Sequence, residues 1–249
     1  MNRILGWLTL AAALASSACK QDAHGDAASG GGEPQDKGFL GGEPAQAASS
    51  PSSGLPEPDM KKPLESYPEL QSGQQIMFLY VAVSKLPPDF AKLAEAYSSE
   101  YRNTYDTFRK NDLLTAIKPQ LEQKIKEAAA SPYAWLQVNH AGLGAYDFER
   151  KGFPVDEFEP GNERYFHDDS SYRIAWANGD QVRFLSVPDE AAAREIESLR
   201  HIAQGVQMRI YFFARSADLN QRIVQAYVTR VRLTDRDGRV LAEYGPQDG

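Results

Sequence analysis

The chain has 249 residues, a formal net charge of -7 at pH 7 and one cysteine. This acidic balance argues against a general nucleic-acid binder, which needs a basic surface, and a single cysteine excludes a disulfide within the chain. Residues 71–249 have the usual length of one domain with its own hydrophobic core.

The first 18 residues have the three parts of a secretory signal peptide. Arg3 supplies a positive charge, Ile4 to Leu14 are apolar, and small residues lead up to Cys19. The apolar run is too short to cross a bilayer as a stable helix. We therefore expect residues 1–18 to be removed and to contribute nothing to the fold.

The stretch Leu14-Ala15-Ser16-Ser17-Ala18-Cys19 resembles the lipobox of bacterial lipoproteins. In that family the cysteine thiol is diacylated and the chain is cut just before it, so the resemblance implies lipidation of Cys19. The family prefers Leu where this chain has Ser16, and Ser16 with Ala18 also fits ordinary signal-peptidase cleavage. A soluble periplasmic or secreted protein is therefore the alternative. Lys20, in place of an Asp, is similar to lipoproteins sorted to the outer membrane, which implies attachment to its periplasmic face.

Residues 19–70 are rich in Gly, Ala, Ser, Pro and acidic side chains and hold few apolar residues. Such a composition does not offset the entropy cost of ordering the chain. We predict a flexible linker over these residues, with a segment that folds on binding at Met60 to Tyr67 as the alternative, and a single α+β domain over 71–249.

The first part of this domain, residues 72–131, reads as helical. Gln75 to Val83 is the most apolar run, and its pattern also fits a buried strand. Ser72 and Gln75 are placed as a capping box, so we predict a helix here. A second helix carries a tyrosine-rich apolar stripe from Phe90 to Phe108, and a third follows Asp112. Pro119 is expected to kink or divide the third helix.

Residues 133–245 read as rich in strands, with one helix that begins at Pro188-Asp189-Glu190. Asn178-Gly179-Asp180 predicts a hairpin between two strands, and Asp235-Arg236-Asp237-Gly238 predicts a second. The apolar alternation changes face near Thr229, which predicts a β-bulge there. The fold expected is N-terminal helices packed on a curved antiparallel sheet or small, partly open barrel.

Two stretches are loosely similar to uncharacterised domains of proteobacterial lipoproteins: residues 146–154 (YDFERKGFP) and residues 231–238 (VRLTDRDG). The resemblance implies no activity, because no chemistry is assigned to such domains.

The residues with metal-ligand chemistry are His140, His167, Asp168 and Asp169. Imidazole and carboxylate ligands suit Zn²⁺ or a similar ion. No HExxH motif or paired histidines support them, so a solvated polar loop is the simpler interpretation. Asp147, Glu149, Asp156, Glu157 and Glu159 could include an acid/base pair, or could form an acidic edge. We predict no cofactor.

The last strands carry a local excess of arginine, with Arg209, Arg230 and Arg232 as the candidate binding residues. Guanidinium groups suit carboxylate and phosphate partners, although charged outward positions also protect sheet edges. With no convincing catalytic set, the sequence favours a non-enzymatic, membrane-anchored binding module of the cell envelope, with an envelope protein or anionic polymer as partner and no nucleic acid. The alternatives are an envelope hydrolase with a His/carboxylate site and a small-ligand carrier with an apolar cavity.

Overall fold

The computed structural model describes residues 54–245, which belong to a compact unit running from Ser50 to Gly249. The predicted signal peptide 1–18, Cys19 and the predicted linker up to residue 53 lie outside the described residues. No helix between residues 54 and 245 is both long enough and apolar enough to cross a membrane.

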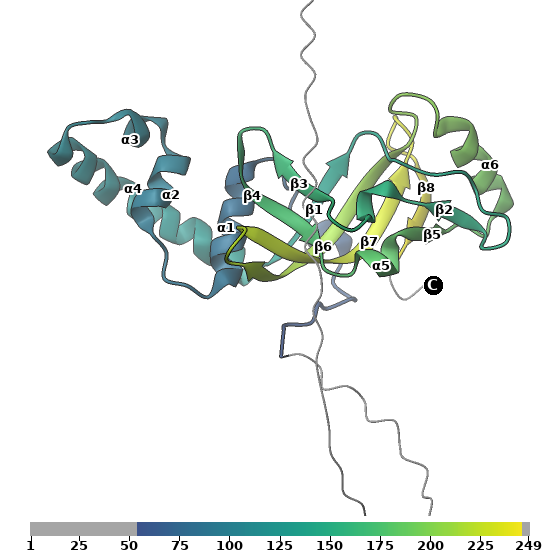
Figure 1. Cartoon of the computed structure of the whole chain (residues 1–249), viewed down its shortest axis with the longest axis horizontal. Coiled ribbons are helices and arrows are strands. Elements are labelled where there is room, and N and C mark those ends of the chain that lie inside the picture. Colours follow the sequence, from purple (N-terminus) through teal and green to yellow (C-terminus); the bar gives the residue numbers. More distant parts are fainter. Residues whose placement is uncertain (1–53, 246–249) are drawn as a thin grey trace, which may run out of the picture. The chain divides into compact units, whose positions relative to one another are not determined.

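The helices of residues 72–131 precede the strands, as predicted. After a short 3-10 turn, η1 (Leu64–Ser66), they are α1 (Gly73–Ser84), α2 (Phe90–Tyr97), α3 (Ser99–Asn103) and α4 (Thr107–Ala130). Figure 1 shows α2, α3 and α4 gathered at one end of this unit, with α1 between them and the sheet.

Helix α1 begins at the predicted capping box. The Ser72 hydroxyl accepts a hydrogen bond from the Gln75 amide, and the Gln75 side chain accepts one from the Ser72 amide. Ile76 and Leu79 pack into the core of the sheet, whereas Met77 and Phe78 pack with α2 and α4. Because α1 is buried on two sides, its sequence lacks a clear helical periodicity.

The tyrosine-rich stretch forms three helices, not the single helix predicted. The Ser98 hydroxyl caps α3 and the Asp106 carboxylate caps α4, so each redirects the chain. Tyr105, which is 96% exposed, and Phe108 therefore project into solvent instead of lining a core. Helix α4 is also longer than predicted and continues through Pro119 without dividing.

The main sheet contains six strands in the order β1-β6-β7-β4-β3, with β8 also paired to β7. Their bounds are β1 (Tyr133–Val138), β3 (Glu163–Phe166), β4 (Asp169–Trp176), β6 (Gln207–Asp218), β7 (Ile223–Thr234) and β8 (Val240–Tyr244). The predicted α+β class is confirmed. The sheet is mixed, because β4 and β7 run parallel, and it does not close into a barrel.

The hairpin predicted at Asn178-Gly179 is wrong. Asn178 is buried, its Oδ1 accepts a hydrogen bond from the Val228 amide (2.7 Å), and its Nδ2 donates to the Val228 carbonyl (3.0 Å). Asn178 therefore fixes the end of β4 to β7. A short helix, α5 (Gly179–Val182), follows, and β5 (Phe184–Ser186) pairs with β2 (Gly152–Pro154) in a separate two-stranded sheet.

One face of the main sheet forms the larger core. Ile210 and Phe212 point into it beside Ile76 of α1. Away from α1, the same core takes in Phe153 and Leu185 of the β2–β5 pair, together with residues of the 3-10 turn η2 (Asp156–Phe158) and of α6 (Glu190–Leu199).

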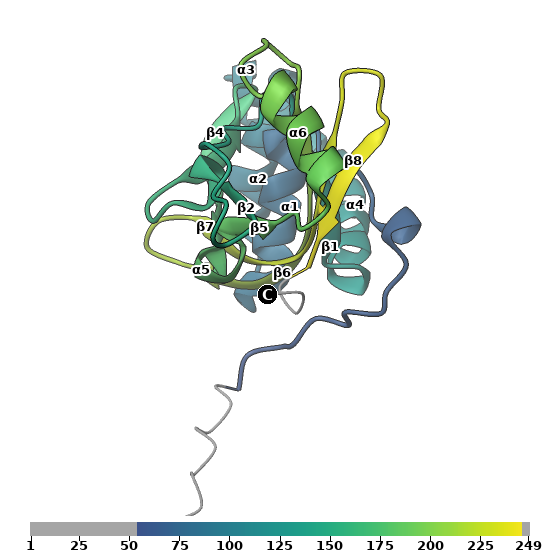
Figure 2. The same ribbon diagram turned by 90° about the vertical axis from the view of Figure 1, so that its right-hand side faces the viewer.

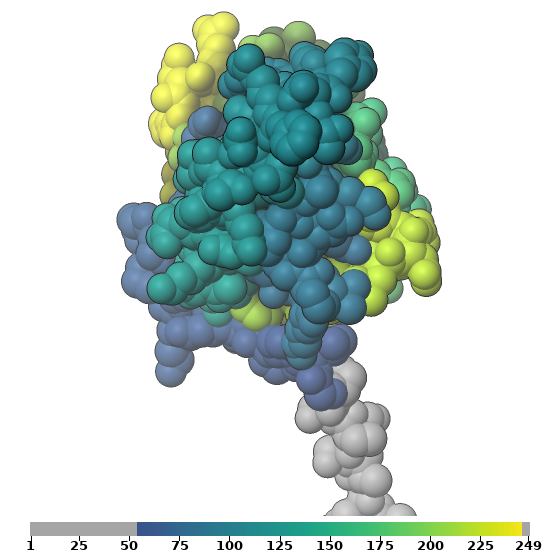
Figure 3. Space-filling view, turned by 90° about the vertical axis from the view of Figure 1, so that its left-hand side faces the viewer, coloured from purple at the N-terminus to yellow at the C-terminus, as the bar shows by residue number. Residues whose placement is uncertain are grey.

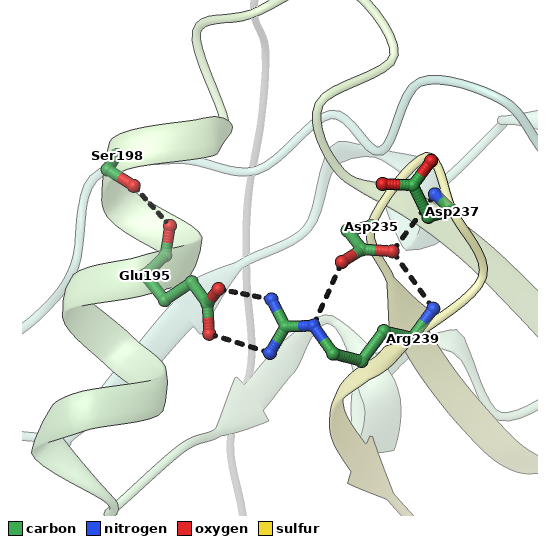
Figure 4. A network of polar contacts seen from close by, with 5 residues as sticks. All are labelled: Glu195, Ser198, Asp235, Asp237 and Arg239. Atoms are coloured by element: carbon green, nitrogen blue, oxygen red, sulfur yellow. Dashed lines mark hydrogen bonds and ion pairs between the residues drawn. The ribbon is translucent and has the colours of Figure 1, made fainter.

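A polar network ties α6 to the β7–β8 turn (Figure 4). The Arg239 guanidinium pairs with Glu195 of α6 and, through Nε, with Asp235 at 3.0 Å. Asp235 also accepts hydrogen bonds from the amides of Asp237 and Arg239. Gly238 has φ +83°, the left-handed conformation predicted for this turn. Residues 235–238 therefore form the turn between β7 and β8, as predicted.

Residues 54–70, which we call the strap, lie against the face of the sheet opposite the main core. In Figure 2 the strap is the dark blue segment, on the other side of the sheet from α6 and the β2–β5 pair. The Trp135 amide donates to the Pro68 carbonyl (3.0 Å), and the Leu70 amide donates to the Trp135 carbonyl (2.7 Å). The prediction of a flexible linker up to residue 70 is therefore wrong for residues 54–70, which are part of the folded unit.

Candidate functional site

The face of the sheet opposite the core carries arginine and aromatic side chains. Along β6, Met208, Ile210, Phe212 and Ala214 are buried in the core, which leaves the alternate residues on the other face. We define the arginine face as four arginines of β6 and β7 with three aromatic rings beside them: Arg209, Arg215, Arg230, Arg232, Trp135, Tyr211 and Tyr227.

A β-bulge in β7 determines on which face of the sheet two of these arginines lie. In the pairing of β6 with β7, Phe212 is opposite Val228 and Tyr211 is opposite Arg230, so Thr229 is the additional residue. The predicted bulge at Thr229 is confirmed. It keeps the apolar side chains of β7 in the core on both sides of the irregularity, and it sends Arg230 and Arg232 to the arginine face.

Each of three guanidinium groups lies over an aromatic ring. Their distances to the ring centroids are 5.1 Å for Arg209 over Trp135, 5.6 Å for Arg232 over Tyr211, and 5.7 Å for Arg215 over Tyr227. Such contacts contribute about 0.5–1 kcal/mol at partly exposed sites and favour one position of each guanidinium over its ring.

The carboxylate of Glu243, on β8, forms ion pairs with two of the arginines. It lies 2.7 Å from Arg232 and 3.8 Å from Arg230. Partial burial, the largest single effect, lowers the pKa of Arg232, but the hydrogen bond and charge of Glu243, together with nearby Tyr211 and Glu65, outweigh it and the net shift is upward. Arg232 consequently keeps its charge under all ordinary conditions.

The Arg209 guanidinium is hydrogen-bonded to the side-chain amide of a glutamine. Its Nε donates to Gln137 Oε1 (3.1 Å), and Gln137 Nε2 donates to Gln207 Oε1 (3.0 Å). Within residues 54–245 no carboxylate lies at ion-pair distance from Arg209. Its charge is thus available to an external anion.

The strap covers the part of the arginine face around Arg215. The Arg215 guanidinium pairs with Glu57, and its Nε donates to the Pro56 carbonyl (3.1 Å). Further along, Tyr67 is 4% exposed and its ring meets those of Tyr133 and Tyr211 edge-on. Burial raises the pKa of Tyr67, so its hydroxyl remains a protonated donor. A carboxylate of the chain's own strap therefore binds the arginine face.

The metal-ligand candidates occupy exposed or partly exposed positions. His140 follows β1, while His167, Asp168 and Asp169 lie at the turn between β3 and β4. Asp168 accepts a hydrogen bond from the Gly73 amide (2.9 Å) and so caps α1. Among residues 54–245, no group of three or more His, Cys, Asp or Glu side chains is placed to hold a metal ion.

Glu157, one of the acidic residues considered for an acid/base pair, is buried and hydrogen-bonded within the fold. It is 7% exposed, and it accepts hydrogen bonds from Arg164 Nε (2.6 Å) and Trp176 Nε1 (3.1 Å). Its lone pairs are engaged by these donors, which leaves the carboxylate unsuited to proton transfer with a ligand.

A cleft of about 640 Å³ lies between the end of α1, the start of α2 and the turn after β6. Figure 3 looks onto this end, where blue helices adjoin the yellow-green β6–β7 turn. The rings of Tyr80 and Tyr172 contact each other at a tilt, with their centroids 5.3 Å apart. The charged lining residues are Lys92, Arg102, Arg222, Asp89, Glu95, Asp168 and Asp169. This lining differs from the apolar cavity that a carrier of small apolar ligands requires.

Sequence reasoning identified Arg209, Arg230 and Arg232 but missed the rings beside them and the strap. The alternation of Tyr133 and Trp135 with buried Ala134 and Leu136 is the signal that places those two rings on the outer face. Comparison with known proteins adds no relative: no family model, no curated protein and no solved structure matches this chain.

Proposed function

We propose that the protein is a lipid-anchored binding module of the cell envelope, and that its arginine face binds an extended acidic polypeptide segment of an envelope partner. The signal-like N-terminus and Cys19 support the anchoring. The Glu57–Arg215 ion pair supports the ligand class, because it is a carboxylate bound on this face.

Beyond the edge of the strap, the open part of the face offers the same chemistry. Arg209 and Arg232 are partly exposed, and each lies over an aromatic ring. Arg232 is also paired with Glu243 and its side chain is only 23% exposed, so a ligand carboxylate must share this guanidinium with Glu243 or replace it there. A guanidinium in a fixed orientation loses little side-chain entropy when it binds a carboxylate. An extended chain also presents carboxylates at about 3.3 Å per residue, which matches the spacing of side chains along a strand.

Fluorescence anisotropy with a fluorescein-labelled hexaglutamate peptide tests this function. The protein is the chain from residue 20 to residue 249, and hexaglutamine is the uncharged control ligand. Arg209→Gln and Arg232→Gln should each weaken hexaglutamate binding about tenfold, because a hydrogen bond to a charged group contributes about 1.5–3 kcal/mol. Binding should also weaken as salt is raised.

Arg236→Gln is the matched control, since Arg236 is an exposed arginine on the turn between β7 and β8. This variant should bind hexaglutamate as the wild type does. Equal affinity for hexaglutamate and hexaglutamine would overturn the proposal. Binding to phosphatidylglycerol vesicles without binding to hexaglutamate would assign the face to lipid instead.

A further inference from the structure

The strap has two unlike parts. Its second part, Tyr67–Leu70, is fixed: Tyr67 is buried, and the backbone from Pro68 to Leu70 is hydrogen-bonded to Trp135 of β1. Removing this part would break strand-like pairing and expose the rings of Tyr133 and Tyr211.

Its first part, Gly54–Lys62, which we call the arm, is held by polar contacts near the surface. Glu57 pairs with Arg215 while its side chain stays 63% exposed. The Asp59 amide donates to the Tyr133 hydroxyl (2.7 Å), and Lys62 Nζ lies 4.9 Å from the Tyr133 ring. Exposed ion pairs contribute about 0–1 kcal/mol, so such contacts exchange easily with those of a ligand.

Beneath the arm lies the same arrangement of groups as on the open part of the face. The Arg215 side chain is 17% exposed and sits over Tyr227, as Arg209 sits over Trp135. Arg215 and Arg209 are both on β6. A register shift between Ala214 and Ser216 interrupts the strand alternation at Arg215, but its contacts with Tyr227 and with Glu57 of the strap place it on the same side of the sheet as Arg209. Release of the arm would therefore lengthen the binding surface along β6.

We propose that the arm is an internal occupant of the arginine face, and that the acidic segment of the partner displaces it and then binds Arg215 as well as Arg209 and Arg232. This inference rests on the proposed function and adds its regulation. A site that is open in only a fraction of molecules has an apparent affinity reduced by that fraction. The arm thus lowers the affinity of the free protein for acidic segments in general.

Variants of the arm test the inference through hexaglutamate affinity. Glu57→Gln should tighten binding about two- to fivefold, the equivalent of one exposed ion pair. Deletion of residues 54–62 should tighten it further and leaves the fixed part in place. Glu122→Gln, which removes an exposed α4 carboxylate paired to Lys118, is the matched control and should leave the affinity unchanged.

Arg215→Gln separates displacement of the arm from a general charge effect. In the wild type it should cost less affinity than Arg209→Gln, because the ligand must first release the arm to reach Arg215. In the chain lacking residues 54–62 it should cost about as much as Arg209→Gln. Equal losses from Arg215→Gln in the two backgrounds would overturn the inference.

Hydrogen exchange gives a readout that does not depend on variants. Saturating hexaglutamate should speed exchange of the Asp59 amide, which is released with the arm, and should leave the Leu70 amide protected. If hexaglutamate binds while Asp59 stays protected, the arm is not displaced and the proposed function stands alone. If hexaglutamate binds neither the wild type nor the deletion variant, both proposals are overturned.

Discussion

The hydroxyl of Tyr67 lies 3.2 Å from Oγ1 of Thr229, and this contact joins the strap to the bulge in β7. Thr229 also donates to the Tyr211 carbonyl (3.2 Å), so its single hydroxyl proton is already used and Tyr67 is the donor between them. The residue that corrects the register of the sheet therefore also holds the segment that covers its outer face.

Removal of this hydroxyl should destabilise the protein measurably. Tyr67→Phe loses one buried hydrogen bond while keeping the ring contacts, and we expect a loss of about 1 kcal/mol in the free energy of unfolding. Tyr67→Ala also removes the ring from between Tyr133 and Tyr211, with an expected loss of about 3–5 kcal/mol. Urea unfolding followed by circular dichroism measures both.

Tyr105→Phe is the control for this comparison, because Tyr105 is almost fully exposed. Its expected effect is within about 0.5 kcal/mol. A loss for Tyr67→Phe no greater than that of Tyr105→Phe would show that the hydroxyl contact does not stabilise the strap.

Features of the fold that depend on local signals were predicted correctly. The capping box at Ser72 and Gln75 and the left-handed Gly238 are each determined by a few neighbouring residues. The bulge at Thr229 was also predicted, because a change of face along one strand is visible in the strand's own sequence.

Features that depend on distant partners were not predicted. Asn178 looks like a turn residue, yet its side chain bonds to Val228, which is 50 residues away. The strap has the polar composition of a linker, yet Tyr67 and Leu70 are buried and its backbone is hydrogen-bonded to Trp135. No local pattern shows which surface such a residue meets. The same limit applies to the site, where arginine positions were predicted but their aromatic partners were not.

Anchoring through Cys19 can be checked directly. When the whole chain is expressed with export in a bacterium, mass spectrometry of the processed N-terminus should find acylated Cys19 as the first residue. Cys19→Ser should remove the acyl groups and release the protein from the membrane fraction. A mature N-terminus with an unmodified thiol would contradict the lipoprotein proposal.

Glu157 should be important for stability, not for activity. Glu157→Ala leaves the Arg164 guanidinium and the Trp176 ring nitrogen without their acceptor. Loss of one partner from a fully buried ion pair costs about 3–5 kcal/mol. Because the Arg164 side chain is 40% exposed and water can reach it, we expect about 2–3 kcal/mol here, measured by urea unfolding.

Glu159→Ala is the matched control for this change, since Glu159 is a nearby exposed glutamate whose backbone alone makes hydrogen bonds. Its unfolding free energy should remain within about 0.5 kcal/mol of the wild type. Equal stability of the two variants would contradict the structural role of Glu157.

The network around Arg239 should make stability depend on pH in the acid range. The hydrogen bond from Arg239 lowers the pKa of Glu195 below its usual value of 4.5. A carboxyl group whose pKa is lower in the folded state contributes stability above its unfolded pKa, and this contribution is lost as the pH falls through the folded pKa. Arg239→Gln should therefore raise the pKa of Glu195 and remove that part of the acid dependence.

Carbon-detected NMR of the Glu195 carboxyl group between neutral pH and pH 2 measures the shift directly. Arg236→Gln removes an arginine from the same turn and should leave the Glu195 pKa where the wild type has it, because Arg239 supplies both hydrogen bonds to this carboxylate. The same titration midpoint for Glu195 in the wild type and in Arg239→Gln would show that the ion pair in Figure 4 does not persist in solution.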